Sequence, residues 1–337
     1  MSVNHEKFEP TQELTELLKR SGSPDKNQSI EASAQFAKAL ELPLRQGVLN
    51  GDILDGIFEP VRLADSAVPE FPLDFLAPGT ESDFVAYTIP NHGYIPERHV
   101  EGDYVMVPTY DIGASIDYLL KYARDARWDV VGRAMEVLEA QFVKKMNDDG
   151  WHTILAAGVD RNIVVFDDDA ANGQFSKRLV SLMKTVMRRN GGGNSTSNNR
   201  GMLTDLYVSP EAMEDIRNWG IDQVDEVTRR EIYTAADGSI NRVFGVNLHD
   251  LDELGEGQEY QTFFSSSLSG SMPAGHNTEI VVGLDLRKRD SFVMPIRQEV
   301  QVFEDDSLHR QKRAGFYGWA EQGFAVLDNR RVILGSL

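Results

Sequence analysis

Three short acidic runs carry the side chains of this 337-residue chain that are best suited to chemistry. They are Asp167–Asp169, the group His249, Asp250, Asp252 and Glu253, and Glu304–Asp306. Two or three carboxylates can hold Mg²⁺ or Ca²⁺, or can act as a general acid and a general base. None of these runs has the spacing of a calcium-binding loop, so a solvated turn is the plainer interpretation of each.

The other residue types that bind ligands or catalyse reactions are scattered. No pair of histidines has ligand spacing on a helix, and a surface or hydrogen-bonded role is expected for His5, His92, His99, His152, His249, His276 and His309. The tryptophans Trp128, Trp151, Trp219 and Trp319 are expected in the core or at an interface. The glycine-rich run 191–201 follows an expected helix and lacks the lysine of a phosphate-binding loop. We therefore predict no catalytic, cofactor-binding or metal-binding residue.

The composition excludes several kinds of site and protein. The chain has no cysteine, so neither disulfides nor thiolate metal sites contribute. No stretch approaches the ~20 consecutive apolar residues of a membrane span, and the acidic N-terminus is unlike a secretory signal. We expect a soluble cytoplasmic product without a membrane partner. Its length suits one large domain or two ordinary ones.

Charge is distributed unevenly along the chain, whose formal net charge is −19. Residues 51–110 contain 11 acidic and 2 basic residues, whereas residues 174–204 contain 6 basic residues and no acidic one. An acidic chain is a poor general binder of nucleic acid, because phosphate affinity comes from lysine and arginine. The two segments are either solvated faces of opposite sign, or complementary surfaces between subunits, or in the basic case a patch that faces packaged polyanion.

The N-terminal third is expected to have little core of its own. Residues 1–50 have the pattern of a polar arm with short helices over 6–20 and 29–40. Such an arm would rest on a partner or stay disordered. Residues 51–110 are rich in proline, glycine and aromatic residues, with short strands expected at 84–89 and 104–108. Such a segment buries little by itself, so we expect it to protrude or to pack on a neighbouring subunit.

The rest of the chain is expected to alternate between helices and strands. Apolar residues at helical spacing over 113–147 predict one long helix of roughly 50 Å, which the segment MNDDG (146–150) should end. A basic helix is expected at 175–189, and a further helix should begin at the N-cap Ser209. Strands are expected at 154–157, 162–166, 203–208, 242–248, 279–285 and 291–303. A β-like run over 316–334 then closes a terminal hairpin.

Several sequence segments resemble segments of a known protein family, and they follow one another along the chain in the same order as in that family. They are ELPLRQGVLNGDILDGIFEPVRL (41–63), IPERHVEGDYVMVPTYDIGASIDYLLKYARDARWDVVGRAMEVLEAQF (95–142), LTDLYVSPEAMEDIRNW (203–219), FGVNLH (244–249) and GWAEQGFAVLDNRRVILG (318–335). Together with the order of elements, they resemble tailed-phage major capsid proteins of the Hong Kong ninety-seven type. The resemblance covers most of residues 40–337.

The resemblance implies an α+β fold with four parts. The N-terminal arm would be residues 1–50, and the extended β-loop with its entry strands would be residues 51–110. A peripheral domain with a long spine helix would join 111–153 to 286–320. An axial α/β domain would join 154–285 to 321–337.

The function implied by the resemblance is structural, with no enzyme activity and no cofactor. Such subunits assemble into hexamers and pentamers of an icosahedral shell that encloses double-stranded DNA without reading its sequence. The expected partners are copies of this chain, a separate scaffolding protein, a portal and a decoration protein. The expected location is the virion, after assembly in the host cytoplasm.

Two departures from the family pattern carry further expectations. In some members, neighbouring subunits of the shell are covalently cross-linked. An isopeptide bond joins a lysine of the extended loop to a neighbour's asparagine, and a glutamate assists its formation. Here no lysine occurs between Ala39 and Leu120, and the segment Phe303–Gly315 has no asparagine. We therefore expect no covalent cross-links. Some members carry a scaffolding domain before the arm, but only about 50 residues precede the extended loop here. We therefore expect a separate scaffolding protein, unless the chain is a processed form.

Two other functions stay open at this point. An encapsulin-like compartment shares the fold and would package an enzyme instead of DNA. A soluble acidic hydrolase would use a metal held by Asp250, Asp252 and Glu253, and would be a small oligomer that loses activity with a chelator. Size in solution and metal dependence separate these alternatives from a shell subunit.

Overall fold

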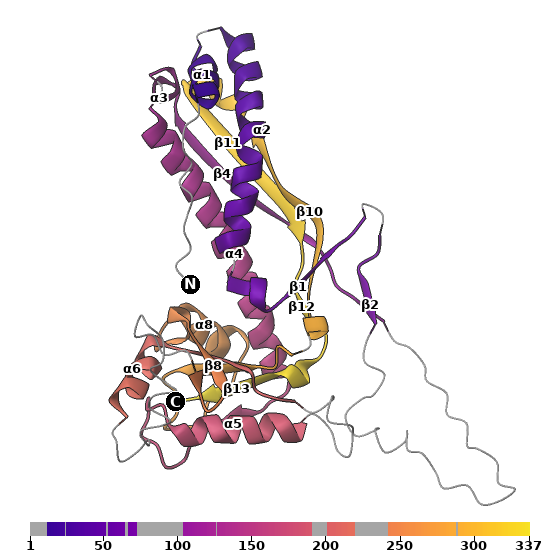
Figure 1. Ribbon diagram of the computed structural model, residues 1–337, viewed down its shortest axis with the longest axis vertical. Coiled ribbons are helices and arrows are strands. Elements are labelled where there is room, and N and C mark those ends of the chain that lie inside the picture. The colour runs from indigo at the N-terminus through magenta and orange to yellow at the C-terminus, as the bar shows by residue number, and fades with distance from the viewer. Residues whose placement is uncertain are drawn as a thin grey trace, which may run out of the picture. The chain divides into compact units, whose positions relative to one another are not determined.

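A computed structural model gives the architecture of the chain (Figure 1). It describes residues 12–23, 25–51, 53–64, 67–72, 104–125, 127–190, 201–219, 242–287 and 289–337. The chain divides into two compact units. Unit 1 comprises Met1–Pro69, Met106–Gly150 and Val293–Ala325, and unit 2 comprises Glu70–Val105, Trp151–Phe292 and Val326–Leu337. Among the helices of the described ranges, none is long and apolar enough to cross a membrane.

Unit 1 is built on a sheet that is covered on one face. Its strand order is β1 (Glu59–Arg62), β10 (Phe292–Glu304), β11 (Arg313–Gln322) and β4 (Tyr110–Leu119), and β12 (Ala325–Val326) also pairs with β10. Strand β11 is antiparallel to both of its neighbours, whereas β1 is parallel to β10. Along β11, Phe316 and Ala320 are buried while Tyr317 and Trp319 are exposed, because successive side chains of a strand point to opposite faces.

Two helices, α2 (Lys26–Gly51) and α4 (Trp128–Asp160), lie along the buried face of this sheet (Figure 1). Phe36 of α2 is fully buried, and its ring centroid lies 5.7 Å from that of Phe316. Burial of an aromatic side chain of this kind stabilises the fold by about 1.5–3 kcal/mol. On the α4 side, a Cβ at Gly318 would lie 3.2 Å from the ring of Phe142, so this glycine lets the helix approach the strand closely.

The shorter N-terminal elements join the same core. Helix α1 (Gln12–Ser21) packs against α2 and against α3 (Leu120–Arg124), and Leu18 of α1 is fully buried. The described helices of residues 1–50 therefore bury apolar side chains within unit 1.

Unit 2 contains a mixed sheet of six strands. Their order is β5 (Val164–Val165), β13 (Val332–Ser336), β9 (Ile280–Leu284), β6 (Asp205–Val208), β8 (Val246–Asp250) and β7 (Arg242–Val243). The pairs β5–β13 and β6–β8 are parallel, and the others are antiparallel. Strands β13, β9 and β6 are buried at every residue, so both faces of the sheet centre are covered.

Different elements cover the two faces of this second sheet. On one face, α5 (Lys177–Asn190) and α6 (Pro210–Asn218) share a core with β6, β9 and β13 that includes Met183, Leu206 and Ile333. On the other, the buried Trp151 contacts Tyr207 of β6 edge-on at 4.7 Å and stacks with Tyr260 of α8 (Glu259–Thr262) at 6.1 Å. Outside both sheets, β2 (Glu70–Pro72) pairs with β3 (Tyr104–Met106).

The structure corrects the prediction of one helix over 113–147. Residues Tyr110–Leu119 form strand β4, and the long helix α4 begins only at Trp128. In β4, Ile112 and Tyr118 are buried while the residues between them are partly or largely exposed. The apolar residues of this stretch fit both a period of two and a helical spacing, and pairing with β11 selects the strand.

Gly150 does not end α4, which continues to Asp160, so the strand predicted at 154–157 is also wrong. A Cβ at Gly150 would lie 2.2 Å from Leu54 Cδ1, and the glycine is therefore explained by close packing. The strand predicted at 242–248 is instead a hairpin. Its two-residue turn places Phe244 and Gly245 at φ of 50° and 74°, as turns that match the twist of the strands require.

Other predictions are confirmed. The basic helix is α5, the strands expected near 204, 280 and 292 are β6, β9 and β10, and β10 and β11 form the antiparallel hairpin near the C-terminus. The Ser209 hydroxyl accepts a hydrogen bond of 3.1 Å from the backbone N–H of Ala212, which makes it the N-cap of α6. The strand expected at 84–89 lies outside the described residues.

Candidate interaction surfaces

The exposed face of the unit 1 sheet carries a cluster of three aromatic rings. Tyr317 and Trp319 of β11 are 41% and 46% exposed. The ring of Phe303 on β10 stacks with that of Tyr317 at 5.5 Å and meets that of Trp319 edge-on at 5.9 Å. We call these three residues the aromatic face. Large apolar side chains on an uncovered sheet are typical of surfaces that bind another molecule.

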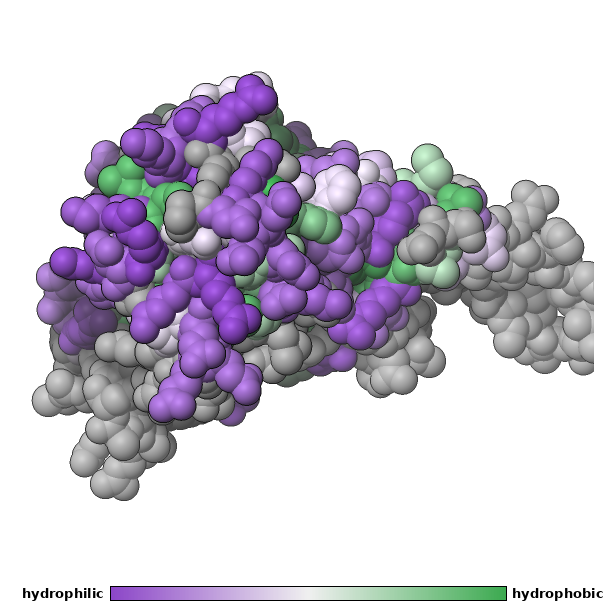
Figure 2. Space-filling model, turned by 90° about the horizontal axis from the view of Figure 1, so that it is seen from above, coloured by the Kyte–Doolittle hydropathy of each residue, from purple (hydrophilic) through white to green (hydrophobic). Residues whose placement is uncertain are grey.

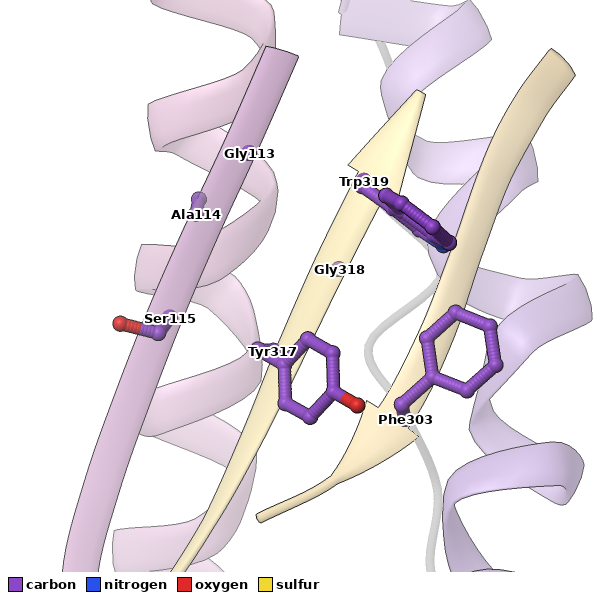
Figure 3. A pocket seen from close by; sticks show the side chains of 7 residues that line it. All are labelled: Gly113, Ala114, Ser115, Phe303, Tyr317, Gly318 and Trp319. Atoms are coloured by element: carbon purple, nitrogen blue, oxygen red, sulfur yellow. The ribbon is translucent and has the colours of Figure 1, made fainter. Parts of the chain in front are cut away.

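A hollow of about 570 Å³ lies beside the aromatic face (Figure 3). The strand register sets Gly113 opposite Trp319 and Ser115 opposite Tyr317. These small residues leave space next to the large rings, and the close view shows the rings over β10 and β11 with β4 alongside. The hollow has no titratable group in its lining apart from the phenol of Tyr317, so its geometry supports apolar contact and not acid–base chemistry.

Ion pairs lie on the same sheet at both ends of the aromatic face. At one end, Arg313 pairs with Asp117 across β11 and β4 at 2.8 Å. At the other, Arg297 pairs with Glu321 at 2.8 Å, and the Thr109 hydroxyl donates to the same carboxylate at 2.6 Å. An apolar centre with a polar rim is the usual arrangement of a protein interface.

One face of the molecule, seen from above, is mostly polar (Figure 2). The space-filling view shows hydrophilic side chains over most of the visible face, with hydrophobic ones in small separate areas (Figure 2). A second group of exposed apolar side chains lies on and beside the β2–β3 ribbon. Val68, Tyr104 and Met106 are 57%, 63% and 64% exposed.

The acidic runs that the sequence singled out have structural roles. Asp167 is buried, accepts a hydrogen bond of 2.5 Å from the Ser176 hydroxyl and pairs with Arg178 at 3.2 Å. Asp305 accepts hydrogen bonds from the backbone N–H and the hydroxyl of Ser307, so it shapes a turn. The side chain of Asp306 lies outside the described residues.

The group around Asp250 does not converge on a metal. Burial and then the charge of Asp252 raise the pKa of Asp250, but His249 turns to Asp205 instead, with Nε2 2.9 Å from Oδ1. Burial alone would raise the pKa of Asp205, but its hydrogen bonds with His249, Thr204 and Asn247 hold it below the usual value. Within the described ranges, no three His, Asp or Glu side chains gather as metal ligands.

The remaining histidines and tryptophans lie in varied environments. His152 stacks on Phe263 at 3.8 Å, and His276 lies 5.4 Å from Phe166. The other histidine side chains, His5, His92, His99 and His309, lie outside the described residues. Trp151 is fully buried, as expected of a core aromatic, whereas Trp319 belongs to the exposed aromatic face.

Sequence reasoning missed a buried ion network in unit 2. Asp285 is completely buried and pairs with Arg287 at 2.9 Å and with Arg331 at 2.5 Å, while the backbone N–H of Met202 donates to it at 2.9 Å. Burial alone would raise the pKa of Asp285, but these donors and charges hold it below the usual range. The neighbouring acidic and arginine residues in LDLRKRD and LDNRR were the available signal.

Comparison with solved structures finds this architecture in known assemblies. The chain matches one in the cyanophage Pam1 capsid asymmetric unit with a TM-score of 0.57 and 12% identity, over 83% of this chain and 88% of that one. The chain has the fold of a phage capsid protein. Its match in the mature capsid of bacteriophage PhiM1 has a TM-score of 0.53 and 11% identity, over 85% and 87% of the two chains. A third match, in the capsid of an empty GTA particle, has a TM-score of 0.54 and 12% identity, over 85% and 90%.

These matches confirm the α+β capsid fold that the resemblance of the sequence segments implied. The sequence itself matches no protein-family model and no curated protein. Only 11–12% of the residues are identical, so the similarity lies in the path of the backbone. The aligned region extends over both units and is not confined to one common motif.

Proposed function

We propose that this chain is a major capsid protein that assembles into hexamers and pentamers of an icosahedral shell around double-stranded DNA. The observation that carries the proposal is the capsid fold, which spans more than four-fifths of this chain and of each of the three capsid chains compared above. The role is structural and not catalytic. The site of action would be the virion, after assembly in the host cytoplasm.

The aromatic face supports the same proposal from within the chain. We propose that Phe303, Tyr317 and Trp319 contact a neighbouring copy, with the Arg313–Asp117 and Arg297–Glu321 pairs as the polar rim. A face used by every copy toward the next copy would generate rings and shells. The domain boundaries expected from the sequence, at residues 50, 110, 153, 285 and 320, belong to this proposal, as do a scaffolding protein, a portal and a decoration protein as partners.

Electron microscopy of negatively stained protein tests the proposal. We expect closed icosahedral particles, or hexameric and pentameric rings, when the chain is produced together with its scaffolding protein. A uniform small oligomer under all conditions would contradict it. The hydrolase alternative would then be tested with Asp250→Asn and with a chelator, and shells that hold a protein cargo in place of DNA would favour an encapsulin-like compartment.

Gel electrophoresis of the same particles tests the absence of covalent cross-links. Particles heated in SDS should release a single band at the 37.7 kDa of the monomer, because the extended segment has no lysine and Phe303–Gly315 has no asparagine. A ladder of covalent oligomers would overturn this part of the proposal.

A further inference from the structure

Strand β4 (Tyr110–Leu119) forms one edge of the unit 1 sheet. It pairs with β11 along one side, and no strand of the described ranges pairs with its other side. Figure 3 shows β4 beside β11, with Gly113, Ala114 and Ser115 along it. A free strand edge presents a row of backbone N–H and C=O groups to which another strand can bind.

The two edges of this sheet differ in how well they are protected. At one edge, β1 has only four residues, Glu59–Arg62, and one of them is Pro60, which has no N–H to donate. At the other, β4 has ten residues, contains neither proline nor lysine, and pairs with β11 without a bulge. Short length, proline, lysine and bulges are the usual means by which soluble proteins keep an edge from binding other strands. The edge of β4 has none of them, so it is suited to pairing.

The hydrogen-bonding pattern identifies the residues of β4 that face the free edge. The backbone N–H of Leu120 donates to the carbonyl of Lys312 at 3.0 Å, directly beyond the paired residues Leu119 and Arg313. Residues of an antiparallel strand bond alternately to one side and to the other. The even-numbered residues of β4 therefore bond to β11, and the odd-numbered ones direct their backbone groups away from it. These odd-numbered residues are exposed: Asp111, Gly113, Ser115, Asp117 and Leu119.

We propose that β4 pairs with β4 of a second copy, antiparallel and about a twofold axis through Ser115. In this register every outward-facing residue bonds across the edge. Asp111 pairs with the partner's Leu119, Gly113 with the partner's Asp117, and Ser115 with the partner's Ser115. About ten hydrogen bonds then join the two strands, because each such pair exchanges two. The two unit 1 sheets become one continuous sheet.

The side chains of β4 select this register. On the buried face, Ile112 lies opposite the partner's Tyr118, and a β-branched residue opposite an aromatic one stabilises neighbouring strands. A slip of two residues in one direction would set Asp111 opposite the partner's Asp117, and like charges directly opposite each other are destabilising. The same slip in the other direction would leave Asp111 without a partner. A slip of one residue would turn the apolar face of one copy to the polar face of the other.

A second copy is the occupant that this edge favours, because a twofold contact needs a surface that is complementary to itself. The pairing leaves Tyr317 and Trp319 free for the contact proposed above, since they lie on the face of the sheet and not at its edge. A head-to-tail contact builds a ring, whereas a twofold contact joins two copies symmetrically and can link one ring to the next. The inference rests on the proposed function for this place between rings.

Cysteine cross-linking tests the pairing, because the chain has no cysteine of its own. In the proposed register the two Ser115 Cα atoms lie about 5.5 Å apart, within the range that a disulfide spans. Particles of Ser115→Cys, mildly oxidised with copper phenanthroline, should therefore run in SDS at roughly twice the 37.7 kDa of the monomer. A thiol reductant should return them to the monomer.

The matched control is Gly113→Cys, on the same strand and the same face. Its two thiols would be four residues out of register, about 14 Å apart at ~3.4 Å per residue, so no dimer should form. A Cβ at Gly113 meets only the Gly318 carbonyl, at 3.6 Å, so the substitution fits the fold. Shells of Ser115→Cys that release only monomer, or a Gly113→Cys variant that dimerises as much, would overturn the inference.

The variant Ser115→Pro tests the contact without oxidation. The N–H that it removes points away from β11, so the ladder within unit 1 stays intact and the melting temperature should stay close to that of wild type. Electron microscopy should show rings but no closed shells, whereas Ser115→Ala should form normal shells. Normal shells from Ser115→Pro would contradict the inference. Absence of rings and shells in the wild type would contradict the proposed function instead, and disulfide dimers of unassembled Ser115→Cys would then support the pairing by itself.

Discussion

The sheets of the two units differ in how completely the chain covers them. In unit 2, strands β13, β9 and β6 are buried at every residue, with α5 and α6 on one face and Trp151 and Tyr260 on the other. In unit 1, β11 alternates between buried and exposed residues, and its exposed face carries two large aromatic side chains. Unit 2 therefore completes its own core, whereas unit 1 leaves an apolar face that a second molecule can cover.

The largest effect on stability is expected from breaking the buried network of unit 2. Arg331→Gln leaves the fully buried Asp285 with a weaker partner, and loss of one member of a buried ion pair costs about 3–5 kcal/mol. Urea denaturation followed by circular dichroism would measure this. The control Arg133→Gln breaks an exposed pair with Glu136 and should cost less than about 1 kcal/mol. Equal losses of unfolding free energy in the two variants would show that the buried ion pair contributes no more to stability than the exposed one.

The same network predicts a pH dependence. Because the pKa of Asp285 is lowered in the folded state, its stabilising contribution is complete at neutral pH. That contribution is lost as the pH falls through the folded-state value, below the usual range of an aspartate. The difference in unfolding free energy between wild type and Arg331→Gln should therefore shrink in strong acid, and a constant difference would show that the carboxylate is not the cause.

Two neighbours on β11 test the alternation in unit 1. Phe316 is 1% exposed and packs against Phe36, whereas Tyr317 is 41% exposed. Phe316→Ala should lower the unfolding free energy by about 3 kcal/mol or more, through lost burial and a cavity. Tyr317→Ala should cost less than about 1 kcal/mol. Calorimetry of both variants would measure the difference, and similar losses would mean that the face is covered within the chain.

A smaller gain in stability is expected at Glu279. This glutamate is buried, accepts a hydrogen bond from Ser209 and has its pKa raised by burial and by the nearby charges of Glu211, Asp215 and Glu256. A raised carboxyl pKa means that the ionised form opposes folding at neutral pH. Glu279→Gln should therefore stabilise the protein by about 1 kcal/mol at pH 7, and the gain should vanish as the pH falls below the carboxyl pKa. Destabilisation at pH 7 would contradict this.

The smallest effect on stability should accompany a complete loss of assembly. Tyr317→Ser/Trp319→Ser removes exposed rings, so the unfolding free energy of the monomer should change by less than about 1 kcal/mol per residue. Particle yield, measured by sedimentation, should fall to background. The control Met202→Ser removes a side chain of similar exposure, 48% against 46% for Trp319, from unit 2. Normal particles from the double variant would show that the aromatic face is not a subunit contact.

The sequence predicted the elements whose patterns are local. Helix α5 has clear helical spacing, α6 has its N-cap at Ser209, and β10 and β11 alternate on either side of a charged turn. Residues 113–119 were misassigned because their apolar spacing fits both a helix and a strand. Gly150 was misread as a helix end because its reason is the contact with Leu54, almost a hundred positions earlier.

The surfaces could be predicted only in part, because they depend on contacts between residues that are far apart in the sequence. The basic character of α5 is visible in the sequence, but the neutralisation of Arg178 by Asp167 and Asp169 is a tertiary feature. The Asp285–Arg331 pair joins residues 46 positions apart. Trp319 was expected in a core or at an interface, and only the register of β11 against β4 and β10 shows which residues share its face.

A cryo-electron microscopy map of assembled particles, at a resolution that shows side chains, tests the central claim most directly. We predict that density from a neighbouring subunit covers Phe303, Tyr317 and Trp319 in every hexamer and pentamer position, and fills the hollow beside Gly113. A map in which this face is open to solvent in all subunits would contradict the claim that unit 1 is completed by another copy of the chain.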